Sequence, residues 1–166
     1  MKYKILILII LTLSIGIESY ACNCGIPKSL ELEQDYNYEN SECIFVGEVL
    51  EVNKTENTFT IKVIESFNGN DNLNVYKGTY DEQCGPIIDT KGKWLIYANL
   101  NSDNILVVGS CGISRNFKNP EYNVTIEGLL IKEFKGTAED QGKKFNDKGK
   151  KDLKVEIERL RVKKEE

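Results

Sequence analysis

Short runs rich in apolar residues, separated by turn sequences, dominate the central part of the chain, and one of them alternates between apolar and polar positions. In TFTIKVIESF, residues 58–67, the side chains of Phe59, Ile61 and Val63 share one face, as in a half-buried strand. Turn sequences such as NKTEN and NGND separate this run from its neighbours. Five such runs predict strands at 43–52, 58–67, 73–78, 91–100 and 105–111. Their regular spacing indicates a mainly β fold, either a small antiparallel barrel or a sandwich.

Two segments with a helical pattern flank the predicted strands. PKSLELEQDYNYENSE, residues 27–42, predicts a short helix, because Pro27 suits the first helical position. YNVTIEGLLIKEF, residues 122–134, predicts a helix that packs on the strands, although Gly128 disfavours a helix interior. The expected domain therefore spans residues 22–131.

The remaining residues, 132–166, form a charged C-terminal extension. Its first part, 135–151, is polar and contains glycines, so we expect it to be flexible. In DLKVEIERLRVKKEE the residues Leu153, Ile157 and Leu160 form a helical stripe, whereas Leu153, Val155 and Ile157 alternate as in a strand. We favour the helix. The extension is interpreted as a solvated basic element, with a docking role as the alternative.

The N-terminus has the layout of a cleavable signal peptide. Lys2 and Lys4 precede an apolar run of 13 residues, Ile5–Ile17, and Ser19-Tyr20-Ala21 supplies small residues before a cleavage point. The run is short for a membrane span, and the alternative is a buried N-terminal helix. We expect residues 1–21 to be removed, leaving no transmembrane span. The mature protein would then be secreted and extracellular, or periplasmic or on the cell surface in a bacterium.

Charge and composition exclude several classes of function. Residues 22–131 hold 8 Lys/Arg against 16 Asp/Glu, whereas residues 132–166 hold 12 against 9. The acidic body argues against nucleic-acid binding. The 166 residues contain no histidine, so Ser–His–Asp and Cys–His catalysis are excluded, together with the commonest zinc ligand. We expect neither an enzyme nor a cofactor of its own.

The five cysteines of an exported chain predict a disulfide framework with one cysteine left over. Cys22 and Cys24 project to the same side of an extended strand, two residues apart, so a bridge between them would be strained. Different partners elsewhere are favoured, and composition alone does not choose them. Cys43 lies within a predicted strand, where it is either a buried thiol or the site of an intermolecular bridge.

The sequence Cys22-Asn23-Cys24 has four interpretations. A structural zinc site would need a second pair of ligands, and a redox pair would need the spacing C-x-x-C. A lipid anchor on Cys22 is possible, but Ser19 and Tyr20 depart from the residues typical of lipoprotein signals. The fourth interpretation is that Cys22 is a free N-terminus held by a disulfide.

A signal peptide that leads directly into C-x-C resembles the N-terminal, netrin-like OB-fold domain of the tissue inhibitors of metalloproteinases. Further motifs of that family have similar counterparts in the same order along the chain. They are NSECIFVGEVLEV, IKVIESFNGNDNLNVY, EQCGPIIDTKGKWLIYANL and ILVVGSCGISRNF. The resemblance covers about residues 22–118, as in the short bacterial-type members. It implies a five-stranded OB-fold barrel with flanking helices.

The resemblance also implies two bridges, Cys22–Cys84 and Cys24–Cys111. They would pin the first strand of the mature protein to the barrel at two points. One feature departs from the family, because its third intradomain bridge starts near the position of Glu39, where no cysteine stands.

The mechanism implied by the resemblance is inhibition of a zinc metalloprotease. The amine and carbonyl of Cys22 would chelate the partner's catalytic zinc, and the side chain of Asn23 would enter the pocket beside it. Cys24 and Gly25 continue this inhibitory strand. Three residues next to Cys84 would form the second wall of the binding wedge, namely Glu82, Gln83 and Gly85.

Two residues depart from the inhibitory pattern of the family. Asn23 stands where Thr or Ser is usual, and Glu82 could repel the catalytic glutamate of a protease. The alternative function is therefore a non-inhibitory exported netrin-like module that binds protein or glycan. Asn53 and Asn123 each begin an N-glycosylation tripeptide, which matters only in a host that glycosylates.

Overall fold

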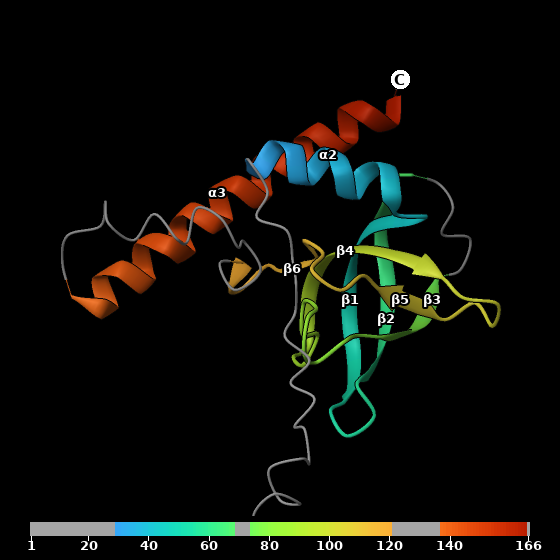
Figure 1. Ribbon diagram of the computed structural model, residues 1–166. Helices are drawn as coiled ribbons and strands as arrows, with labels where there is room; N and C mark the ends of the chain where they lie inside the picture. The colour runs from blue at the N-terminus through green and yellow to red at the C-terminus, as the bar shows by residue number, and fades with distance from the viewer. Residues whose placement is uncertain (1–28, 69–73, 121–136, 166) are drawn as a thin grey trace, which may run out of the picture.

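Six strands and two helices form the parts of the chain that the computed structural model describes, residues 29–68, 74–120 and 137–165 (Figure 1). All five predicted strand runs contain a strand, and the sixth strand is a two-residue segment. The elements in chain order are α2 Leu30–Asn40, β1 Cys43–Asn53, β2 Thr58–Ser66, β3 Val75–Thr79, β4 Gly92–Leu100, β5 Leu106–Val108, β6 Arg115–Asn116 and α3 Ala138–Glu165.

Five of the strands close into a barrel. Their order is β1-β2-β3-β5-β4, and β1 also pairs with β4, so the sheet has no open edge between these strands. This is a mainly β, OB-fold-like barrel with flanking helices rather than a sandwich. The expectation of a purely antiparallel barrel is corrected, because β3 and β5 pair in parallel. A closed ring of five strands cannot alternate direction throughout, so one pair must be parallel.

The interior of the barrel is filled by the inward faces of all five strands. Phe45 of β1 stacks on Tyr76 of β3 with ring centroids 6.2 Å apart. Phe59 lies opposite Gly78 across the β2–β3 ladder, and a Cβ atom at Gly78 would overlap its ring. Cys43 is completely buried in this cluster and keeps its thiol. The apolar positions that alternate in residues 58–67, namely Phe59, Ile61 and Val63, therefore face the interior of the barrel.

The outer face of β1 and β4 is covered by α3 (Figure 1). Leu153, Ile157 and Leu160 pack there against an apolar cluster formed by Ile44, Val46, Phe67, Leu95, Tyr97 and Ile113. The helical interpretation of this stripe is confirmed, but the stripe is buried rather than solvated.

The expectation of a flexible segment at 135–151 is corrected for residues 138–151, which form the first half of α3. A capping box begins the helix: Asp140 N–H donates to Thr137 Oγ1 at 3.2 Å, and Thr137 N–H donates to Asp140 Oδ2 at 3.1 Å. Because the second half is anchored on the barrel, extending the helix backwards adds a hydrogen bond per residue without a new nucleation cost. The helix predicted at 122–134 lies outside the described residues.

A buried ion pair joins α3 to the barrel. Arg115 of β6 pairs with Glu156 of α3, and both side chains are almost completely inaccessible to water. Tyr97 Oη donates a hydrogen bond to Glu156 Oε1 at 2.7 Å. Burial lowers the pKa of Arg115 to about 10 and raises the pKa of Tyr97. Arg115 nevertheless stays protonated at neutral pH, so the charged pair persists.

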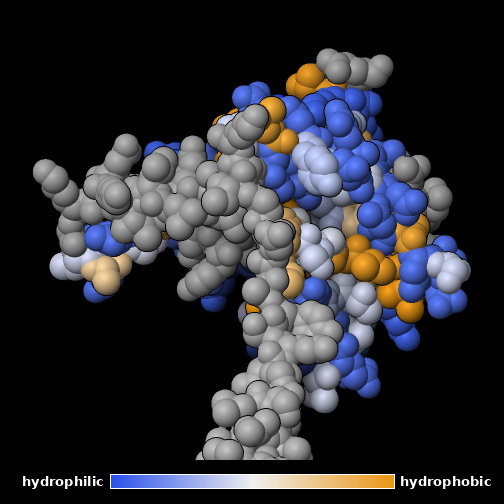
Figure 2. Space-filling model, in the orientation of Figure 1, coloured by the Kyte–Doolittle hydropathy of each residue, from blue (hydrophilic) through white to orange (hydrophobic). Residues whose placement is uncertain are grey.

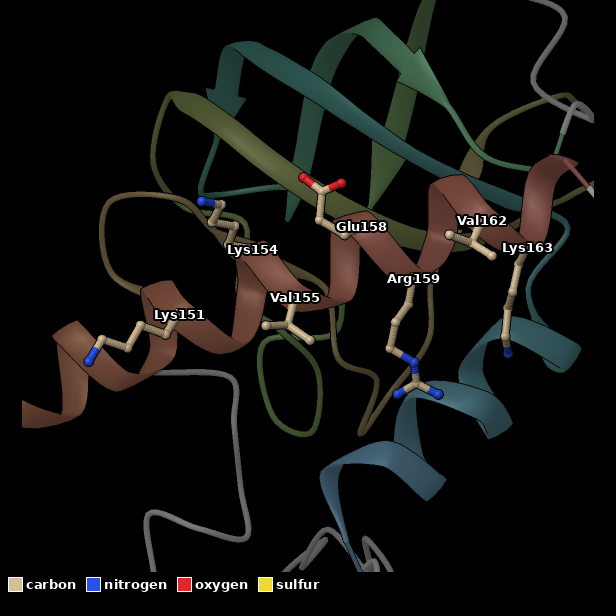
Figure 3. A pocket seen from close by; sticks show the side chains of 7 residues that line it. All are labelled: Lys151, Lys154, Val155, Glu158, Arg159, Val162 and Lys163. Carbon is tan, nitrogen blue, oxygen red and sulfur yellow. The ribbon is translucent and has the colours of Figure 1, made fainter.

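The helix α2 is held by α3 through charged side chains. Ser29 caps α2 by accepting a hydrogen bond from Leu32 N–H at 3.3 Å. Asp35 accepts hydrogen bonds from Arg159 at 3.2 Å and from Lys163 at 2.7 Å, and Lys163 lies over the ring of Tyr38. Arg159 and Lys163 point from α3 towards α2 in Figure 3. These contacts fix the element that directly follows the predicted inhibitory strand.

Candidate functional site

Cys84 and Cys111 lie side by side on the barrel. Cys84 belongs to the loop between β3 and β4, and Cys111 to the loop between β5 and β6. The amide of Cys111 donates a hydrogen bond to the carbonyl oxygen of Cys84 at 2.6 Å. Both cysteines are disulfide-bonded. The two cysteines that the resemblance implies as partners of Cys22 and Cys24 are therefore adjacent, although they are 27 positions apart in the sequence.

Asp81 organises the loop around Cys84. Its Oδ1 accepts a hydrogen bond from Gln83 N–H at 2.8 Å, and its Oδ2 accepts one from the Ser110 hydroxyl at 3.0 Å. Its carbonyl oxygen accepts the amide of Gly85 at 3.1 Å. The hydrogen bond from Gln83, followed by that from Ser110, holds the pKa of the Asp81 carboxyl below its usual range. Asp81 is therefore ionised at neutral pH and links the two cysteine-bearing loops.

The backbone beside Cys111 adopts a conformation that favours glycine. Cys111 has a φ of 61°, in the left-handed region, and the amide of Gly112 donates to Gly109 O at 3.0 Å. A non-glycine residue in this region costs about 1–2 kcal/mol. A cysteine at this strained position is explained by the disulfide that its sulfur forms.

The turn between β1 and β2 lies beside the same loop. Tyr80 N–H donates to Asn57 O at 3.1 Å, and Lys54 pairs with Asp89 at 3.0 Å. In Figure 1 this turn forms the lower end of the barrel. Asn53 of the glycosylation tripeptide is the last residue of β1 before this turn and is exposed. Three loops thus gather in one region of the barrel.

The structure describes only part of the predicted site. Glu82 and Gln83 are exposed and Gly85 is half-buried, so all three border the surface around Cys84. Cys22, Asn23, Cys24 and Gly25 lie outside the described residues, as does Asn123. The pairs Cys22–Cys84 and Cys24–Cys111 therefore stay predictions.

A groove with both polar and apolar walls continues from this surface along the β3–β4 loop. Asn116 Nδ2 donates to Thr90 Oγ1 at 3.3 Å across it, and Ile87 is 45% exposed at its side. The groove is lined by Gly85, Ile87, Asp89, Thr90, Trp94, Asn116 and Asn119. The sequence alone does not predict this groove, because its walls come from three segments of the chain.

A second groove runs along the outward face of α3 (Figure 3). Val155 and Val162 are 60% and 58% exposed there, among three lysines and Arg159. Arg159 and Lys163 already pair with Asp35, so they are committed to holding α2. The described surface in Figure 2 is otherwise largely hydrophilic, with separate apolar patches on the barrel.

Comparison with known proteins identifies no family for this chain. No protein-family model matches the sequence, and no curated protein is significantly similar to it. Within the described ranges, no group of three or more His, Cys, Asp or Glu side chains could hold a metal ion, and no helix is long and apolar enough to cross a membrane. A functional assignment must therefore start from the geometry around Cys84 and Cys111.

Proposed function

We propose that this protein is an exported inhibitor of zinc metalloproteases and that it caps the catalytic zinc with the N-terminal amine and carbonyl of Cys22. The observation that carries the proposal is the adjacency of Cys84 and Cys111 on an OB-fold-like barrel. It supports the pairing implied by the resemblance to the tissue inhibitors of metalloproteinases.

The spacing of the N-terminal cysteines matches two adjacent attachment points. In an extended strand, residues 22 and 24 lie about 7 Å apart and project to the same side. A disulfide brings two Cα atoms to within about 4.4–6.8 Å. One straight strand can therefore reach both Cys84 and Cys111, whose backbones are hydrogen-bonded to each other. Two anchors on one short strand fix its direction as well as its position.

The chemistry at the end of this strand suits a zinc ion that keeps one position for water. The amine and the carbonyl oxygen of Cys22 form a five-membered chelate, which displaces the catalytic water. Only the neutral amine binds, and its ordinary pKa is about 7.7–8.0. Inhibition should therefore strengthen as the pH rises towards 8.

Rigid attachment lowers the cost of binding. A free N-terminal segment would lose its conformational freedom on entering a protease cleft, whereas a strand held by two bridges has already lost it. Asn23 would point into the pocket beside the zinc. The exposed residues Glu82 and Gln83 would contact the opposite wall of the cleft.

The proposal is tested by adding one alanine before Cys22 of the mature protein. We expect the extended protein to lose at least about a hundredfold in affinity for a zinc metalloprotease catalytic domain, since the amide nitrogen that replaces the amine is not a zinc ligand. Its urea unfolding midpoint should equal that of the wild type, which shows that the fold is intact. Unchanged inhibition by the extended protein would instead support the alternative of a module that binds through its barrel surface.

A further inference from the structure

We infer that Asp81 and Ser110 form a clamp that positions the two cysteine-bearing loops and thereby aims the inhibitory strand. The inference rests on the proposed function, because aiming matters only if the N-terminus of that strand must reach a zinc ion. Asp81 and Ser110 are positioning residues, since neither is expected to touch the partner's metal.

The clamp is a hydrogen-bonded bridge between loops that have no ladder between them. Asp81 Oδ2 accepts from Ser110 Oγ at 3.0 Å, and beside it Cys111 N–H donates to Cys84 O at 2.6 Å. Asp81 Oδ1 accepts from Gln83 N–H at 2.8 Å, which fixes the carboxylate relative to its own loop. A single carboxylate therefore joins both loops by hydrogen bonds of the stronger, charge-assisted kind.

Each loop buries an apolar side chain, Ile88 in the loop of Cys84 and Ile113 in the loop of Cys111. Apolar packing does not, however, enclose the residues that form the bridge itself. Asp81, Cys84 and Cys111 are only half-buried, and Ser110 is exposed. The residues of the bridge differ in this respect from the strands beneath them, whose inward side chains are enclosed in the barrel. The distance and angle between the two cysteines thus depend on the bridge through Asp81 and Ser110 together with the backbone hydrogen bond from Cys111 to Cys84.

The consequence for the proposed inhibition is geometric. The two bridges attach the N-terminal strand to the barrel at two points. If one loop shifts, the strand therefore rotates about the bridge to the other loop. The Cys22 amine lies at the end of that strand, where a turn produces the largest displacement. Ligand atoms must lie within a few tenths of an ångström of their place to coordinate a metal, so a small shift weakens chelation.

A double-mutant cycle tests the clamp. We expect Asp81→Ala and Ser110→Ala each to raise the Kd for a zinc metalloprotease catalytic domain about tenfold. The double variant should be no weaker than either single variant, because both changes break the same bridge. Asp81→Asn should stay within about twofold of the wild type, since its carbonyl can accept from Gln83 and its amide group can donate to Ser110.

The matched control is Asp103→Ala, in the exposed turn between β4 and β5. It removes the same charge without touching either cysteine loop, and we expect its Kd to stay within about twofold of the wild type.

Hydrogen exchange of the Cys111 amide provides a readout that does not depend on inhibition. NMR should show exchange about tenfold faster in Asp81→Ala and Ser110→Ala than in the wild type, and no change in Asp103→Ala. If these rates behave as expected while the wild-type protein binds no metalloprotease, the clamp stands and the proposed function fails. Unchanged exchange in the single variants, or additive losses in the double variant, would overturn the clamp.

Discussion

The interior of the barrel and the interface beneath α3 are both well buried, but they are built differently. The interior contains hydrophobic side chains throughout, together with the thiol of Cys43. The interface adds the ion pair of Arg115 and Glu156 and the hydroxyl of Tyr97 to its apolar cluster. Closure by strand pairing already fixes every side chain in the interior, so volume and apolarity suffice there. A helix on a convex surface can slide, and we expect the buried charged pair to hold α3 in one position.

The two regions also serve the proposed site from different directions. The barrel presents the loops of Cys84 and Cys111, to which the inhibitory strand would be bonded. The helix α3 holds α2, which begins at Leu30, five positions after the last residue of the predicted strand, Gly25. One region would fix the anchors of the strand, and the other would fix the point where the chain leaves it.

The largest loss of stability is expected from Glu156→Leu, which removes the charged pair that distinguishes the interface beneath α3 from the barrel interior. This change leaves Arg115 buried without its counter-charge, which typically costs about 3–5 kcal/mol of the free energy of unfolding. Urea denaturation followed by circular dichroism measures the loss. The matched control is Glu158→Leu two residues away, whose side chain is 60% exposed and pairs only with Arg161 at the surface among the described residues. A loss in the control as large as that in Glu156→Leu would show that the buried pair is not what holds α3.

The next largest effect is expected when one isoleucine in each region is replaced by alanine. Ile96 is completely buried in the closed interior, whereas Ile157 is 8% exposed beneath α3. We expect Ile96→Ala to lower the free energy of unfolding by about 4 kcal/mol and Ile157→Ala by about 2 kcal/mol, because a helix can settle into the space and a closed barrel cannot. Urea unfolding of both variants tests the order, and a larger loss at Ile157 would reverse the comparison.

The smallest effect is expected from Arg161→Ala at the rim of the interface. Arg161 forms two hydrogen bonds with Glu65, at 2.8 and 2.9 Å, and they hold the pKa of Glu65 below its usual range. A lowered folded-state pKa adds stability that is present above the ordinary glutamate value of about 4.3 and is lost as the pH falls through the lowered value. The variant should therefore lose a little stability at pH 7 and none at pH 2. A difference between variant and wild type that is the same at both pH values would contradict this origin.

The sequence predicted the barrel better than its surroundings, for physical reasons. The alternation of β2 records one buried and one open face, and the apolar run of β1 records a strand that is buried on both faces, which is local information in each case. The first half of α3 has almost no large apolar residue, and its helical state follows from a cap and from the anchoring of the second half. Arg115 belongs to a class that is normally exposed, so its burial could not be predicted without its partner in α3.

The candidate site also contains residues that the sequence predicts and residues that it does not. Cys84 and its neighbours Glu82, Gln83 and Gly85 were found through a motif, and Asp81 could have been found through the turn that its side chain makes with Gln83. Ser110 could not have been predicted from the sequence, because its contact with Asp81 joins residues that are 29 positions apart. Contacts of this kind exist only once the barrel has brought the loops together.

The most direct test of the central claim is the visible absorption of a metalloprotease in which cobalt replaces zinc. The d–d bands of cobalt(II) report the atoms that surround the metal. Binding of the mature protein should change these bands, since a nitrogen and an oxygen of Cys22 would replace water, and the protein extended by one alanine should leave them unchanged. Tight binding of the mature protein with an unaltered cobalt spectrum would contradict the claim that Cys22 caps the partner's metal.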